Sequence, residues 1–104
     1  MPIVQMIWWD SKGKKYLKPV ELTEKDLPAG KITFIEIVSK EKAYVRLRLT
    51  DSGAYHSHLA AGQSPQGWAC YIGRVNAAGT MLEGEWRRDD GAYGGGGKFT
   101  LPLI

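Results

Sequence analysis

The sequence predicts a single all-β domain over residues 1–104, a small antiparallel barrel or sandwich of seven or eight short strands. Three observations support this fold class. A chain of 104 residues can build one hydrophobic core. Its 13 glycines and 5 prolines indicate many turns and therefore short elements. Apolar and charged residues alternate in 45–49, as they do in a half-buried strand.

The first strand is expected at Ile3–Trp9, where apolar side chains occupy both alternating faces. Residues 10–13 contain the Asp and Gly of a tight turn. A second strand follows at 14–22, with Pro19 pushing it toward an edge or a bend. Residues 23–27 begin like a helix cap, and the proline and glycine that follow limit them to a single helical turn.

The clearest pair of strands covers 31–39 and 42–50 and predicts a β-hairpin. In its second strand Arg46 and Arg48 share the solvent-facing side. Two cations on one face repel each other, so we expect acids on a neighbouring strand to face them. The candidates are Glu36, Glu83 and Glu85.

The second half of the chain is less regular. Residues 54–61 fit either a strand or two turns of helix, and the Pro- and Gly-containing stretch after them is a loop in both cases. Strand character returns at 68–75 and 80–88, and the chain ends in a strand at 98–104. Nothing in this half has the length of a crossover helix, which favours antiparallel pairing.

The run Gly94-Gly95-Gly96-Gly97-Lys98 invites comparison with a phosphate-binding loop. The P-loop pattern requires a glycine where Ala92 stands and a serine or threonine where Phe99 stands. Such loops also need a helix after the glycines, and here strands are expected on both sides. The run is therefore predicted to be a turn, with a flap at the mouth of a pocket as the functional alternative. We find no motif for a cofactor.

Candidates for chemistry are few. His56 and His58 would project from one face of a strand, as metal ligands can, but no second spaced pair of donors accompanies them. Cys70 lies in an apolar strand and is expected to be a small core residue. No acid, base and nucleophile converge, so no catalytic residue is predicted and the protein is not expected to be an enzyme.

The aromatic residues point to binding. Four tryptophans are many for a core of this size, and an eight-stranded barrel has room inside for side chains or one small ligand. Trp86 shares its strand phase with Leu82, away from Glu83 and Glu85. We expect it to be buried and to line a cavity whose rim is formed by 91–97. The candidate ligand-binding residues are Trp68, Trp86, Tyr71 and Trp8.

The stretch 82–88, LEGEWRR, is followed by a Gly-rich turn and by GKFTL at 97–101. This pattern resembles the closing hairpin of avidin-like and lipocalin-like (calycin) β-barrels and covers about a quarter of the chain. The chain is short for an eight-stranded barrel, and no glycine precedes Trp8-Trp9 as in an N-terminal Gly-x-Trp signature. The resemblance implies a barrel that binds a small ligand, and it specifies neither biotin nor a lipid.

Charge and composition bear on partners and location. The net charge of +3 permits an anionic partner without requiring one. A single cysteine fits a reducing compartment. No stretch approaches the roughly 20 apolar residues of a spanning helix, and no signal peptide is recognisable. We therefore expect a soluble, cytoplasmic protein that does not bind membranes; an oligomer is compatible with the sequence.

The predicted function is a binding module for a small apolar ligand or a protein partner. The alternative is a barrel of the OB type that binds single-stranded nucleic acid. In that interpretation lysines follow the phosphates while aromatic residues stack on bases; the residues are Lys14, Lys15, Lys18, Trp8, Trp9 and Tyr16. The two interpretations differ in whether the tryptophans line a cavity or lie on an open sheet face.

Overall fold

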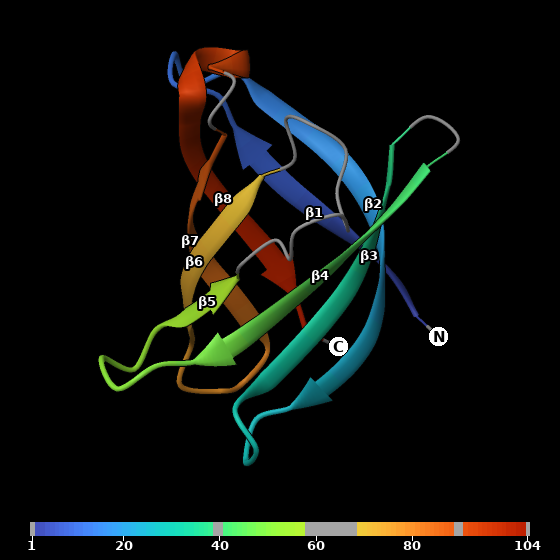
Figure 1. The fold of residues 1–104 in the computed structure, drawn as a ribbon, viewed down its shortest axis with the longest axis vertical. Helices are drawn as coiled ribbons and strands as arrows, with labels where there is room; N and C mark the ends of the chain where they lie inside the picture. Colours follow the sequence, from blue (N-terminus) through green and yellow to red (C-terminus); the bar gives the residue numbers. More distant parts are fainter. Residues whose placement is uncertain (1, 39–40, 58–68, 89–90, 104) are drawn as a thin grey trace.

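The computed structural model describes residues 2–38, 41–57, 69–88 and 91–103, and it forms a closed antiparallel barrel of eight strands (Figure 1). Each strand pairs with its neighbours in sequence, and β1 also pairs with β8. The predicted fold class is confirmed, and the barrel is the correct one of the two architectures. The strands are β1 (Ile3–Trp9), β2 (Lys15–Asp26), β3 (Lys31–Val38), β4 (Glu41–Leu49), β5 (Tyr55–Ser57), β6 (Cys70–Val75), β7 (Met81–Arg87) and β8 (Gly96–Pro102).

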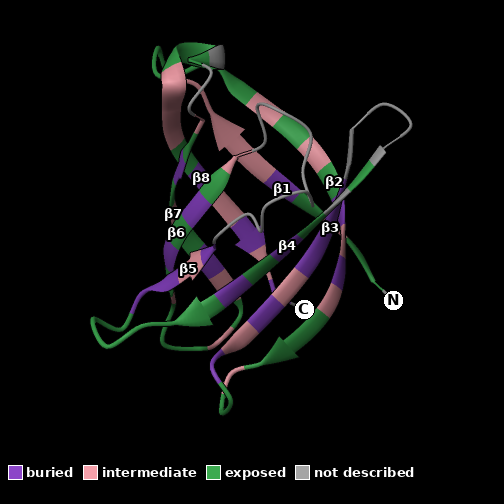
Figure 2. Ribbon diagram, in the orientation of Figure 1, coloured by how far each residue is buried: buried purple, intermediate pink, exposed green. Residues whose placement is uncertain are grey.

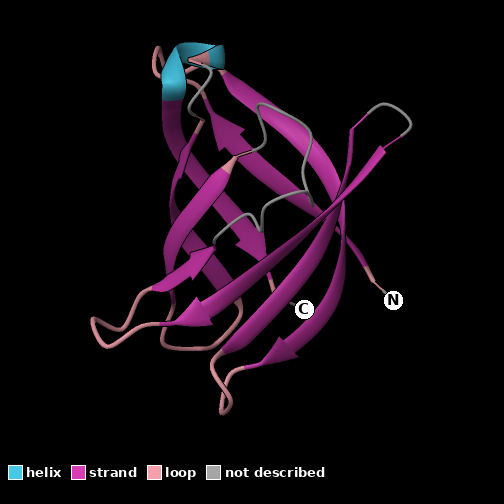
Figure 3. Cartoon of the chain, viewed as in Figure 1, coloured by secondary structure: helices cyan, strands magenta, loops and turns pink. Residues whose placement is uncertain are grey.

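Helical structure is confined, in the described part of the chain, to the short 3-10 helix η1 (Ala92–Gly95) between β7 and β8 (Figure 3). The helical turn expected at 23–27 is wrong, because β2 continues through it to Asp26. A β-bulge between Leu22 and Glu24 restores pairing with β3, and the Thr23 hydroxyl donates to the Thr33 carbonyl at 3.0 Å instead of capping a helix. No helix in these ranges has the length and apolarity needed to cross a membrane.

Alternate side chains of every strand point into the barrel, which gives the banding of buried and exposed residues in Figure 2. Arg46 and Arg48 are exposed on the outer side of β4, as predicted. The prediction that Glu36, Glu83 or Glu85 faces these arginines is wrong. Glu36 points into the barrel, and Glu83 and Glu85 lie on β7, away from β4. Glu24 is the acid that shares a shallow cavity with the two arginines.

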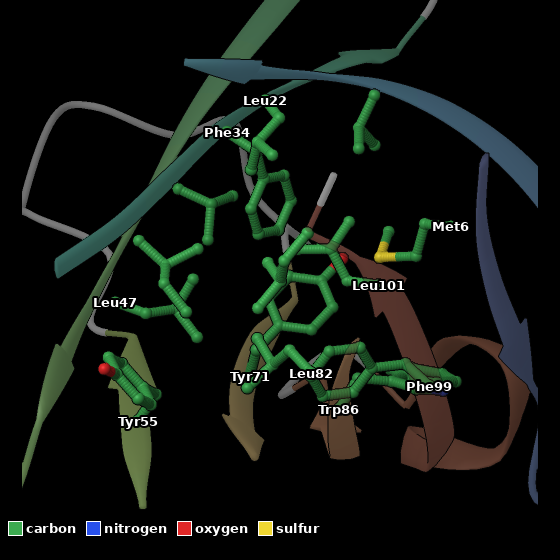
Figure 4. Packing of buried hydrophobic residues seen from close by; sticks show 14 residues of the cluster. Met6, Leu22, Phe34, Leu47, Tyr55, Tyr71, Leu82, Trp86, Phe99 and Leu101 are labelled. Atoms are coloured by element: carbon green, nitrogen blue, oxygen red, sulfur yellow. The ribbon is translucent and has the colours of Figure 1, made fainter. Parts of the chain in front are cut away.

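The core is a single apolar cluster inside the barrel (Figure 4). Its members come from all eight strands and from the residue after β8. They are Met6, Val20, Leu22, Ile32, Phe34, Val45, Leu47, Tyr55, Tyr71, Leu82, Trp86, Phe99, Leu101 and Leu103. The first and last strands, β1 and β8, both contribute to this cluster, so the burial of their side chains depends on closure of the barrel.

Two glycines allow the strands around this core to approach closely. Gly73 and Gly84 face each other across β6 and β7. A Cβ on Gly84 would overlap the carbonyl oxygen of Ile72. Gly84 is also the glycine of the Gly-x-Trp pattern, so the pattern has a steric reason here: the strand before Trp86 must pass against the backbone of β6.

A second close approach closes the barrel. The indole Nε1 of Trp86 on β7 donates a hydrogen bond to the main-chain carbonyl of Trp9 on β1 at 2.7 Å. Gly97 of β8 is the cross-strand partner of Trp86, and a Cβ at this position would overlap the Trp9 carbonyl oxygen. The missing side chain at position 97 therefore lets the indole reach across β8 to β1.

We expect Gly84→Ala to lower the free energy of unfolding by about 2–3 kcal/mol, because the added methyl must displace the backbone of β6. Gly13→Ala is the matched control. Gly13 has a φ of 85° but nothing within 4 Å of an added Cβ, so its cost is the left-handed backbone alone, about 1 kcal/mol. Urea unfolding measures both. Equal stability of the two variants would show that the approach of β6 to β7 is not a constraint.

Candidate functional site

The structure places three of the four predicted ligand-binding residues together inside the barrel. Tyr71 and Trp86 are cross-strand partners on β6 and β7, and both are buried. Trp8 is partly buried and meets the edge of the Trp86 ring at a centroid distance of 5.3 Å. Figure 4 shows Tyr71 and Trp86 directed into the interior beside Phe99. The fourth, Trp68, lies outside the described residues.

A charged group lies among these apolar side chains. Glu36 on β3 is 1% exposed, and its Oε1 accepts hydrogen bonds from the Tyr71 hydroxyl and from the Lys18 ammonium, the latter at 3.2 Å. Within the described chain, no hydrogen bond to its second oxygen, Oε2, accompanies these two. We call Lys18, Glu36 and Tyr71 the interior polar cluster. It connects the core to solvent, because the Lys18 side chain is 27% exposed.

Sequence reasoning missed this cluster because charge was taken as a sign of a solvent-facing position. The period-2 pattern contained the signal: Ile32, Phe34 and Glu36 are two residues apart and therefore share one face of β3. Lys18 was named in the sequence analysis only as a possible phosphate contact. The pairing of β1 with β2 places it opposite buried Met6, on the inner face.

Burial is the main cause of a strong rise in the pKa of the Tyr71 phenol, and the charge of Glu36 raises it further. The hydrogen bond to Glu36 acts in the same direction, because the phenol donates it only when protonated. The guanidinium of Arg88, which follows β7, opposes the rise. Tyr71 is therefore held as a neutral hydrogen-bond donor.

Aromatic rings cover the barrel end beside this cluster. Trp8 stacks on Tyr16 with centroids 4.1 Å apart and planes 9° apart. Tyr93 of η1 packs edge-on against both rings, at 4.9 Å and 5.4 Å. We call Trp8, Tyr16 and Tyr93 the aromatic rim. Lys14 and Arg88 add cation–π contacts to Tyr16 and Tyr93.

The glycine-rich segment positions the aromatic rim. Tyr93 has a φ of 55°, the one non-glycine residue with positive φ among those described, and Gly94 and Gly95 continue in the left-handed region. The Ser11 amide donates to the Tyr93 carbonyl at 3.2 Å, which ties η1 to the β1–β2 turn. Strands flank the segment on both sides, so it turns the chain, as predicted, and presents Tyr93 to the barrel end.

Trp9, next to Trp8 on β1, points to the outside of the barrel. It lines a groove of about 560 Å³ on the outside of the barrel, between the β1–β2 turn and β8. The other lining residues are Asp10, Ser11, Gly13, Gly97 and Lys98. We call this the Trp9 groove. Of the residues expected to contact nucleic acid, three thus make contacts inside the barrel: Trp8, Tyr16 and Lys18. Trp9 faces outward, and Lys15 is its cross-strand partner.

The remaining candidates do not join a site. His56 lies on β5 next to Arg48 and Ile72, and His58 lies outside the described residues. Three or more His, Cys, Asp or Glu side chains do not gather in a metal-binding group in the described ranges. The expectation that Cys70 is a core residue is wrong: because Tyr71 points inward, the alternation of β6 turns Cys70 outward, where it is exposed.

Comparison of the chain with protein-family models, with curated proteins and with solved structures gave no match.

The environment of Tyr71 predicts an alkaline loss of stability. Its folded pKa lies above the ordinary value of 10.0. Once the pH exceeds the unfolded value, the unfolded state binds fewer protons than the folded state, so the free energy of unfolding falls as pH rises. Urea unfolding of the wild type and Tyr71→Phe near neutral pH and above pH 10.0 measures this. The variant should lose less stability over the interval; an identical loss would mean that Tyr71 is not the group responsible.

Proposed function

We propose that the protein binds a small molecule at the barrel end formed by the interior polar cluster and the aromatic rim. The ligand has an apolar, ring-containing body and a head group that donates hydrogen bonds. The body packs against the aromatic side chains, and the head reaches Glu36. Catalysis is not part of the proposal, because the groups present bind and orient without supplying a nucleophile.

The burial of Glu36 is the observation that carries this proposal. Removing a carboxylate from water is costly, and replacing a buried ion pair by apolar side chains is often neutral or stabilising. Glu36 nonetheless follows the core residues Ile32 and Phe34 on the inner face of β3, with one oxygen serving both Lys18 and Tyr71. Ionisable groups with perturbed pKa values gather at functional sites, and Tyr71, whose pKa is raised, belongs to the same cluster.

The chemistry of the ligand follows from what the cluster offers. Oε2 of Glu36 is an acceptor, and an ammonium, hydroxyl or amide N–H group complements it. A cationic head can also take the place of Lys18, whose partly exposed ammonium can return to solvent. Aromatic walls favour a flat ring as the body of the ligand, since ring pairs gain from stacked and edge-on contacts.

The topology agrees with this class of function. Eight strands that pair in sequence order form an up-and-down barrel, the arrangement of lipocalins and of streptavidin. An OB fold is a five-stranded Greek-key barrel, and the strand order here is not of that type. The likeness of the closing hairpin to calycins supports the proposal at the level of architecture; the interior polar cluster supplies the argument for binding.

Two ligands with the same indole body and opposite heads test the proposal: tryptamine and indole-3-acetate. We expect isothermal titration calorimetry to show saturable binding of tryptamine and weaker binding of indole-3-acetate. Glu36→Gln removes the charge with little change of shape and should weaken tryptamine binding about 10–100-fold, the range of a charge-assisted hydrogen bond. Glu83→Gln makes the same chemical change on the exposed face of β7 and should have no effect.

A second variant keeps the proposal testable if Glu36→Gln does not fold. Lys18→Met leaves Glu36 without its ammonium partner, so a cationic ligand should bind more tightly than to the wild type. Opposite effects of Glu36→Gln and Lys18→Met are the signature of a ligand head at this carboxylate. The proposal fails if tryptamine gives no binding heat with either the wild type or Lys18→Met.

A further inference from the structure

We infer that the Trp9 groove, on the outside of the barrel, is a docking surface for single-stranded nucleic acid. This site is separate from the interior one, because Trp9 and Trp8 project from opposite faces of β1. The inference rests on three features of the groove: an outward indole, a floor partly formed by glycine, and lysines on both sides.

Trp9 provides the stacking face. Its side chain is only partly buried, and it lines a groove whose volume of about 560 Å³ is within the range of pockets that hold small ligands. Gly13 and Gly97 line the same groove and add no side chains to fill it. A base can therefore lie flat on the indole, an interaction that any base can make.

Cations surround this stacking face. Lys98 lines the groove itself, and Lys15 is directly opposite Trp9 on β2. Lys12 is exposed on the turn that forms one wall, whereas Lys14 of the same turn lies over the Tyr16 ring of the aromatic rim. Lysines placed along an aromatic face match the phosphates and bases of a single strand.

The described acids nearby reduce this positive field without cancelling it. The Asp10 carboxylate is used within the turn: it accepts hydrogen bonds from the Lys12 and Lys14 amides, both at 2.9 Å, and from the Tyr16 hydroxyl. Glu85 is the cross-strand neighbour of Lys98, and it lies 3.9 Å from Arg87. Among the described residues, Lys12, Lys15 and Lys98 therefore outnumber the two acids Asp10 and Glu85.

Charge and shape together favour a single strand over other anionic partners. A membrane surface calls for an apolar face that inserts beside the cations. The Trp9 groove is instead a recess with one aromatic wall; Lys98 lines it, and Lys12 lies on the adjoining turn. A recess of this kind accepts an unpaired base and excludes the stacked interior of a duplex.

Fluorescence anisotropy of a labelled oligothymidylate of about 12 nucleotides, a length of the order that single-strand-binding domains cover, tests the inference. We expect saturable binding at low salt that weakens as salt is added. Trp9→Leu keeps an apolar side chain on the strand without an aromatic face and should weaken binding roughly tenfold. Trp9→Phe restores a ring and should recover most of the affinity.

Lysine variants test the electrostatic part. Lys98→Gln and Lys15→Gln should each lower the slope of log K against log salt by about 0.7, the value for one phosphate of a single strand. Lys25→Gln, an exposed lysine at the far end of β2, is the matched control and should leave the slope unchanged. Glu36→Gln should also leave oligonucleotide binding unchanged, which separates this site from the interior one.

The inference is overturned if the oligonucleotide does not bind at low salt, or if Trp9→Leu binds it as tightly as Trp9→Phe does. It is also overturned if phosphatidylserine vesicles bind with the same dependence on Trp9 while the oligonucleotide does not, since the surface would then serve a membrane.

Discussion

The hydrogen bond from the Trp86 indole to the Trp9 carbonyl is the contact on which the rest of the barrel depends. The paired stretch of β1 and β8 is short: Ile7 lies opposite Thr100, and Trp8 lies opposite Phe99. The indole adds a direct link from β7 to β1 across Gly97, where any side chain would block it. This link holds the end of β1 in the orientation in which the Trp8 side chain points into the barrel and the Trp9 side chain points outward.

Inside the closed barrel, one polar cluster stands against the apolar packing that stabilises the fold. Rings and aliphatic side chains fill the interior, as expected for an eight-stranded barrel. The interior polar cluster interrupts this packing with a carboxylate whose desolvation must be offset by Lys18 and Tyr71. Replacing all the members of such a buried cluster by apolar side chains is often neutral or stabilising, so the charge at position 36 is the clearest departure from the requirements of folding alone.

Much of the fold could be predicted from local pattern, and the site could be predicted only in part. Ile3–Trp9 matches β1, and the alternation around Arg46 gave the correct phase of β4, because a strand with one wet face shows its period directly. The inward position of Lys18 depends on its register with Met6, a long-range pairing that no local pattern contains. Glu36 was misplaced because charge was given more weight than its spacing from Phe34. The burial of Trp86 could be predicted because exposed Glu85 and Arg87 flank it in a clear alternation. Residues 69–72 are apolar on both faces, so Cys70 was wrongly assigned to the core.

The opposite orientations of Trp8 and Trp9 have a thermodynamic consequence. The carbonyl that receives the Trp86 indole belongs to the same residue whose side chain lines the outer groove. A molecule that displaces Trp86 from within takes away the hydrogen-bond donor of the Trp9 carbonyl. If the two faces bind ligands as proposed, their occupancies are linked through a single peptide group, and linkage of this kind acts with equal strength in both directions.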